Sequence, residues 1–143
     1  MRVAFVAPFF GAAAAGGAES EARNTALRLA ASGLAVDVLT TCLLDLHHDW
    51  TVNYHRQGVT ADAGLTVHRF RVEPFNLKAF GRLNVKVLDG GSLTPEEERQ
   101  FISMHVNSYD LYRFLAEEES RYDWICFIPY LFGTTYLDRK SVV

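Results

Sequence analysis

Short, continuous apolar runs recur along the chain, separated by segments in which apolar residues are spaced differently. A continuous apolar run is typical of a strand that is buried on both faces of a parallel sheet. The pattern therefore predicts four parallel strands, near residues 2–7, 34–40, 65–71 and 123–128.

The first helix is predicted at residues 18–32. Ala22, Ala26 and Leu29 recur there at helical spacing, and Gly33 follows as a common helix end. The strand, helix and strand that fill residues 2–40 form a βαβ unit.

A second helical segment is predicted at residues 95–120. It begins at Thr94-Pro95-Glu96-Glu97, which combines an N-cap, a proline in the first turn and a capping-box glutamate. The apolar residues that follow fit one long helix, or two helices broken near Asn107-Ser108. The three glutamates 96–98 are read as a solvated first turn.

Two segments, 41–64 and 73–93, show no clear period and are expected to be irregular. The alternation of strands and helices predicts the α/β class: a Rossmann-like open parallel sheet with helices on both faces. Ligands bind such sheets outside the carboxyl ends of the strands. Loops 8–17 and 129–133 each follow a predicted strand, so we expect them to border the same crevice.

Composition changes this picture little. The 143 residues are 49% hydrophobic and 22% charged, which suits one globular domain. A net charge of -3 gives no electrostatic footprint for nucleic acid, and no run approaches the ~20 apolar residues of a membrane span. We expect a cytoplasmic protein, with peripheral attachment to the inner face of the membrane as an option. A signal peptide at the N-terminus is the alternative.

The two cysteines, Cys42 and Cys126, have no metal-type spacing and are expected to be reduced thiols. His47, His48, Asp49 and His55 are read as a polar loop rather than a metal site, because the spacing matches no ordered ligand set. In the same loop, Trp50 and Tyr54 either stack on a sugar ring or cover the core. No bound metal or cofactor is predicted.

Gly16-Gly17 is the most informative feature for function. Two glycines at the start of a helix let backbone amides approach an anion, which the helix dipole also favours. The alternative is a tight turn that needs glycine only for its backbone angles. A P-loop is excluded because Gly17-Ala18 stand where Lys-Ser/Thr would follow, and the spacing of a dinucleotide fingerprint is missing. Asp37 is expected near the sheet edge.

Several segments also carry a resemblance. They are Arg2-Val3-Ala4-Phe5-Val6-Ala7-Pro8, Gly16-Gly17-Ala18-Glu19, Leu27-Arg28-Leu29-Ala30 with Gly33, and Val36-Asp37-Val38-Leu39-Thr40-Thr41. Together they resemble the start of the family 4 glycosyltransferases. Residues 127–136, and more weakly residues 47–50 and 83–97, look like one subgroup of that family.

The resemblance implies the N-terminal, acceptor-side half of a GT-B architecture, truncated, with the C-terminal donor-binding domain absent from residues 1–143. It implies a retaining, metal-independent transfer of a sugar from a nucleoside diphosphate sugar to a carbohydrate or other acceptor. The chain alone is expected to be inactive. A flavodoxin-like or response-regulator-like binding module, or a non-catalytic remnant, are the alternatives.

Carried over to this chain, the resemblance makes Gly16 and Gly17 the donor diphosphate loop and Glu19 a polar contact at the helix start. Many relatives carry a histidine where this chain has Pro129-Tyr130. We therefore expect Tyr130 and Thr134 to line the crevice, with His48 and Trp50 on the acceptor side, and no catalytic role transfers to any of these residues.

Overall fold

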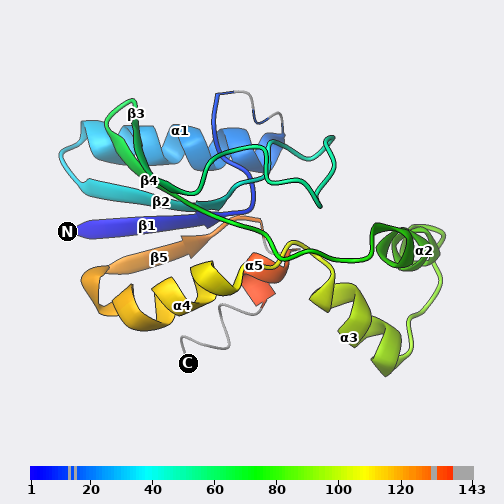
Figure 1. Cartoon of the computed structure of the whole chain (residues 1–143). Coiled ribbons are helices and arrows are strands. Elements are labelled where there is room, and N and C mark those ends of the chain that lie inside the picture. Colours follow the sequence, from blue (N-terminus) through cyan, green and yellow to red (C-terminus); the bar gives the residue numbers. More distant parts are fainter. Residues whose placement is uncertain (13, 15, 130–131, 137–143) are drawn as a thin grey trace.

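The computed structural model describes residues 1–12, 14, 16–129 and 132–136, and these residues form a single mixed sheet with helices around it (Figure 1). The strands within this part of the chain stand in the order β3-β4-β2-β1-β5. Their bounds are β1 (Arg2–Ala7), β2 (Ala35–Thr41), β3 (Gly58–Asp62), β4 (Leu65–Phe70) and β5 (Trp124–Phe127). The helices are α1 (Gly17–Ala31), α2 (Leu77–Leu88), α3 (Pro95–Ser103), α4 (Tyr109–Glu118) and the short α5 (Gly133–Tyr136), with a 3-10 turn η1 (Glu119–Arg121) after α4.

All four predicted strands are present and parallel to one another, which confirms the predicted fold class. The structure adds β3, which pairs antiparallel with β4 at one edge of the sheet. The side chains of β3 are largely exposed. Its sequence therefore shows neither the continuous nor the alternating apolar pattern from which a strand is predicted. Ala63 (φ 50°) and Gly64 (φ 85°) form the two-residue loop of this hairpin, both with the positive φ that such a turn requires.

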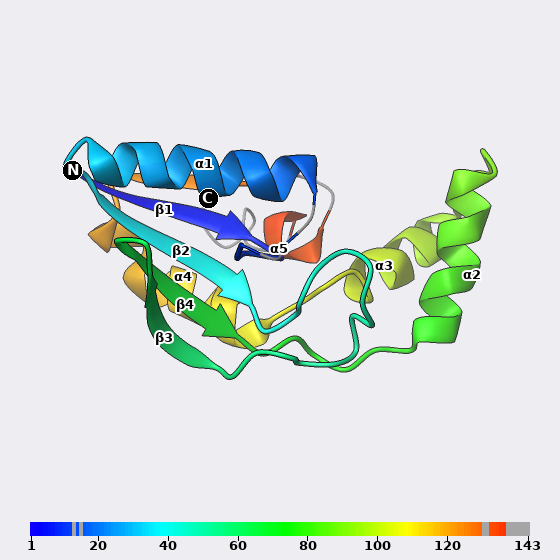
Figure 2. The ribbon, with the colours of Figure 1, turned by 90° about the horizontal axis from the view of Figure 1, so that it is seen from above.

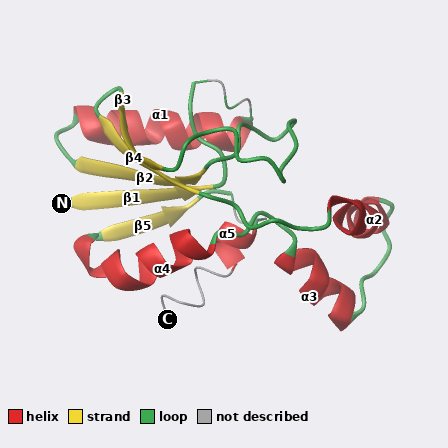
Figure 3. Cartoon of the chain, in the orientation of Figure 1, coloured by secondary structure: helices red, strands yellow, loops and turns green. Residues whose placement is uncertain are grey.

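Helices cover both faces of the sheet, as the fold class predicts (Figures 1 and 3). Alternate residues of β1 point to opposite faces, so one strand supports both layers. Val3 and Phe5 join the core beneath α1. Ala4 and Val6 join the core beneath α4.

The second helical segment is broken into α3 and α4. The capping box at Thr94 is present, with the Glu97 side chain bonded back to the backbone of Thr94. Val106 then has a positive φ of 52°, and Ser108 begins α4 by accepting a hydrogen bond from the backbone N–H of Leu111. The two-helix alternative is therefore right, and a single helix over residues 95–120 is wrong.

Helix α2 falls in a segment that was expected to be irregular. It buries only Phe80, while Leu77 and Leu88 remain 45% and 76% exposed. With α3 it extends beyond the carboxyl ends of the strands and stands apart from the sheet (Figure 2). Among the described residues, no helix has the length and apolar character needed to cross a bilayer.

Asp37 lies in the interior of the sheet, so its expected place near the edge is wrong. It belongs to β2, which is flanked by β1 and β4, and it is 2% exposed. Arg2 donates to Asp37 Oδ2 at 2.7 Å, and the Tyr122 hydroxyl donates to the same oxygen at 2.9 Å. Burial, reinforced by Asp37, raises the pKa of Tyr122. The interaction joins β1, β2 and the segment before β5 at the amino end of the sheet.

Both cysteines are free thiols in the structure. Cys42 is buried at the end of β2, and Cys126 is partly buried in β5. Burial raises the pKa of each thiol, which keeps both protonated and unreactive.

Replacing Tyr122 with phenylalanine tests the buried interaction around Asp37. Tyr122→Phe removes one charge-assisted hydrogen bond, so we expect the free energy of unfolding to fall by about 1–3 kcal/mol. Urea denaturation measures this change in the free energy of unfolding. Tyr109→Phe is the matched control, since Tyr109 is 64% exposed, and it should change stability by less than about 0.5 kcal/mol. Equal stability of the two variants would show that the Tyr122 hydroxyl contributes nothing.

Candidate functional site

The loops after β1 and β5 meet at the carboxyl edge of the sheet. From β1 the chain passes through α1 to β2 on one side, whereas β5 pairs with β1 on the other side. Strand β1 is thus the point at which the strand order reverses, and ligands bind open sheets at such points. Phe9 and Phe132, one from each loop, pack edge to face with ring centroids 5.5 Å apart. The two loops are therefore in contact at this edge, and the crevice that they were expected to border stays a prediction.

Gly16 and Gly17 lie at the start of α1. Gly16 is the N-cap residue in an extended conformation (φ -177°, ψ 154°), and no side chain caps the helix. Among the described residues, no side chain or more distant backbone atom would lie within 4 Å of a Cβ placed on Gly17. Because Gly17 is helical and faces open space, neither its backbone angles nor its packing requires glycine. The first N–H groups of a helix lack partners within it, and Gly17, the first residue of α1, is exposed.

Glu19 packs against Gly16. A Cβ on Gly16 would lie 1.9 Å from Glu19 Oε2, so a larger residue there would displace the carboxylate, which is the end of a flexible side chain. Glu19 is 8% exposed and places negative charge in the first turn, where the helix dipole stabilises it. Gly16 and Glu19 are thus packed against each other, whereas Gly17 faces solvent.

Trp50 packs within a cluster of aromatic side chains, which we call the aromatic cluster. Its ring stacks on His105 with centroids 5.9 Å apart and an interplanar angle of 20°, and its Nε1 donates to the backbone oxygen of Leu46. The residues in the aromatic cluster are Phe9, Trp50, Phe80, Phe101, His105 and Phe132. In this structure Trp50 covers the core and connects α2 and α3 to the sheet.

His48 remains accessible near the same edge. Its side chain is 49% exposed, and its Nδ1 lies 2.8 Å from Asp45 Oδ1. The same oxygen accepts hydrogen bonds from the backbone N–H groups of His47 and His48. Asp45, which was not singled out from the sequence, therefore fixes the conformation of this loop.

Thr134 lies in α5, next to the meeting point of the loops, but it is fully buried. The chain packs closely here, since a Cβ on the neighbouring Gly133 would lie 2.6 Å from the backbone oxygen of His105 and 2.2 Å from Asn107 Oδ1. The Thr134 hydroxyl has no hydrogen-bond partner within the described part of the chain. Tyr130, the other crevice candidate, lies outside the described residues.

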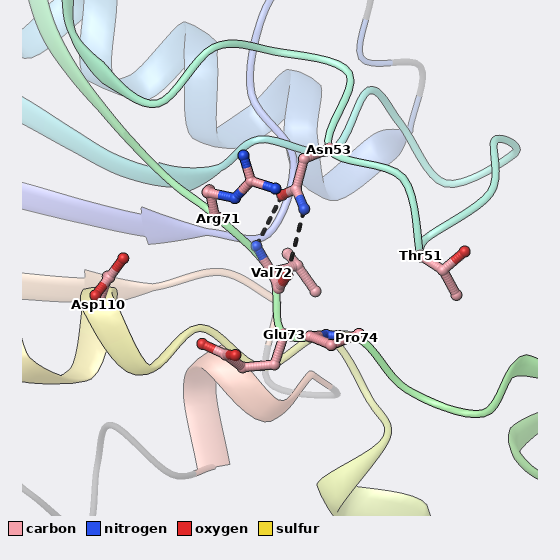
Figure 4. A pocket seen from close by; sticks show the side chains of 7 residues that line it. All are labelled: Thr51, Asn53, Arg71, Val72, Glu73, Pro74 and Asp110. Carbon is pink, nitrogen blue, oxygen red and sulfur yellow. Dashed lines mark hydrogen bonds between the residues drawn. The ribbon is translucent and has the colours of Figure 1, made fainter.

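A polar cavity of about 340 Å³ lies at the same edge, and the sequence analysis did not find it (Figure 4). It is formed by the loop after β2, the segment after β4 and the first turn of α4. Its lining residues are Thr51, Asn53, Arg71, Val72, Glu73, Pro74 and Asp110. The available signal was the position of residues 71–74 directly after a buried parallel strand, where ligand-binding residues gather.

Comparison with known proteins adds no family. No family model matches the chain, and neither a curated protein nor a solved structure matches it. The residues of the carboxyl edge and the resemblance in the sequence are therefore the two supports for a function.

Acidification tests the role of His105 in the aromatic cluster. Burial lowers the pKa of His105 from its ordinary 6.5 to about 4. The neutral ring therefore contributes stability that is complete above pH 6.5 and is lost as the pH falls towards 4, amounting to about 3 kcal/mol.

His105→Phe keeps an aromatic ring and removes the titration. We expect the variant to lose about 3 kcal/mol less stability than the unchanged protein between pH 7 and pH 4, measured by urea denaturation at each pH. Parallel pH profiles for the two proteins would show that His105 titrates normally and that the aromatic cluster does not exclude water from it.

Proposed function

We propose that this chain is the acceptor-side domain of a retaining glycosyltransferase that uses a nucleoside diphosphate sugar as donor. The observation that carries the proposal is the open start of α1 at Gly17, located where the strand order of the sheet reverses. A helix N-terminus in that position favours an anionic group such as a diphosphate. The resemblance of residues 1–41 to family 4 glycosyltransferases supports the same donor.

The chemistry that these residues supply is electrostatic. When a sugar leaves its donor, negative charge develops on the diphosphate, and N–H groups fixed beforehand at a helix start stabilise that charge. The helix end supplies part of the compensation that a metal ion provides in other transferases, in line with a metal-independent reaction. No residue of this chain is assigned as a catalytic acid, base or nucleophile.

The remainder of the donor site belongs to a second domain in this proposal. The resemblance assigns most contacts to the nucleotide and sugar to that domain, which faces the carboxyl edge across a cleft. The partners of the chain are then the donor, a carbohydrate or other acceptor, and the donor-binding domain.

A cytoplasmic location is part of the same proposal. Helix α2 is the element suited to peripheral contact with the inner face of a membrane, because Lys78, Arg82 and Lys86 are spaced four residues apart and Leu77 and Leu88 are exposed. Fractionation of cells tests this location, and recovery of the protein outside the cell would contradict it.

Gly17→Val tests the proposed function in the protein that carries both domains. The new side chain points into the space that the diphosphate would occupy, so we expect kcat/KM for the donor to fall about 100-fold. Because the Cβ meets no atom of the other described residues within 4 Å, the free energy of unfolding should change by less than about 0.5 kcal/mol.

Gly81→Val is the matched control. Gly81 is also helical with no atom within 4 Å of a Cβ, but it lies on α2, away from the glycine loop. The kcat/KM of the Gly81→Val variant for the donor should equal that of the unchanged protein. An unchanged kcat/KM in Gly17→Val would remove the loop from the donor site, and a loss of stability parallel to the loss of rate would reduce Gly17 to a structural glycine.

A further inference from the structure

The cavity beside β4 is built from three segments that are fastened to one another. The side-chain amide of Asn53 makes two hydrogen bonds to the backbone of Val72: Val72 N–H donates to Oδ1 at 2.8 Å, and Nδ2 donates to the Val72 oxygen at 3.3 Å. These two hydrogen bonds hold the loop after β2 to the end of β4, much as backbone hydrogen bonds hold neighbouring strands (Figure 4).

The segment after β4 is held to the start of α4 in a similar way. Glu73 N–H donates to the backbone oxygen of Asn107 at 2.8 Å, and the Tyr109 N–H lies 3.3 Å from Glu73 Oε1. The walls of the cavity therefore exist before any ligand arrives, which lowers the conformational entropy that binding would cost.

The polar groups around the cavity include both hydrogen-bond donors and acceptors. Glu73 and Asp110 contribute carboxylates, and Arg71 contributes a guanidinium for which the described residues provide no ion pair. Asp110 is already held from both sides, by Arg113 on Oδ1 and by Gln57 on Oδ2 at 3.3 Å. Pro74 and Val72 add apolar surface beside these groups.

This combination selects a class of ligand. Arg113 balances the charge of Asp110, and the Arg71 guanidinium balances that of Glu73, so the groups around the cavity carry no net charge that would select an anion or a cation. No three His, Cys, Asp or Glu side chains among the described residues converge on a metal position. A sugar ring fits, because each hydroxyl both donates and accepts and the C–H groups pack on apolar surface. A volume of about 340 Å³ lies at the small end of ligand cavities, sufficient for one ring.

The geometry points to this cavity as the binding site for a neutral sugar ring of the acceptor. That the bound sugar is the acceptor rests on the proposed glycosyltransferase function. That the cavity binds a sugar does not. Strand β4 is separated from β1 by β2 alone, which puts the cavity on the order of 10 Å from the carboxyl end of β1. A sugar held there lies beside the diphosphate position rather than on it.

Amide NMR spectra of the chain, titrated with methyl glycosides of glucose, galactose, mannose and N-acetylglucosamine, test the binding. We expect at least one glycoside to shift the amides of residues 51–53, 71–73 and 110 more than any others. Absence of shifts in these residues with all four glycosides would overturn the inference. A response there to inorganic pyrophosphate in preference to every glycoside would overturn it as well, because the site would then select anions.

Two variants identify the groups responsible. Asp110→Asn and Glu73→Gln keep the shape of each side chain and remove its charge, so each should weaken glycoside binding about tenfold. Glu117→Gln, an exposed carboxylate on the same helix as Asp110, is the control and should bind as the unchanged chain does. Unchanged binding in both cavity variants would contradict the assignment.

Transfer assays on the protein with both domains separate this inference from the function on which it partly rests. Asp110→Asn should raise KM for the acceptor about tenfold and leave KM for the donor unchanged. If sugar is transferred and the acceptor KM does not move, the cavity is wrongly assigned while the function stands. If glycosides bind in the cavity and no sugar is transferred, the proposed function fails and the sugar site remains.

Discussion

The position of β1 between β2 and β5 is the constraint on which the rest of the structure depends. The pairing of Ala7 with Thr40 on one side and of Val6 with Phe127 on the other fixes both neighbours in parallel register. Because β1 is buried almost throughout and its side chains alternate, four consecutive residues, 3–6, pack beneath α1 on one face and beneath α4 on the other. The loop that leaves β1 must then pass the loop that leaves β5, which brings the start of α1 and the start of α5 to one edge.

The two ends of the sheet serve different purposes. At the amino end, Asp37 is buried and holds Arg2 and Tyr122 by short hydrogen bonds. At the carboxyl end, apolar rings fill the space between the loops and α2 and α3, but the first turn of α1 and the cavity beside β4 remain open. In the proposed function, binding takes place at the carboxyl end, where open α/β sheets usually bind their ligands.

The sequence predicted the parts of the fold that a local pattern determines. Residues 3–7 are apolar because that strand is buried on both sides, and Thr94 to Glu97 start a helix by contacts within four residues. It missed β3, whose exposed residues are ordered mainly by pairing with β4, and α2, which buries only Phe80. At the site, glycine chemistry identified Gly16 and Gly17, but the cavity joins Asn53, Val72 and Asp110, and no local pattern relates positions so far apart in sequence.

The central claim is that the open start of α1 is an anion-binding site at the reversal point of the sheet. Amide NMR spectra of the chain, titrated with uridine diphosphate and with guanosine diphosphate, test it most directly. The account predicts that the largest shifts fall on the amides of Gly16 and Gly17, with smaller ones in residues 132–135, and that Asp37 and Tyr122 at the opposite end do not respond. Unmoved amides at Gly16 and Gly17, or largest shifts at the amino end of the sheet, would contradict it.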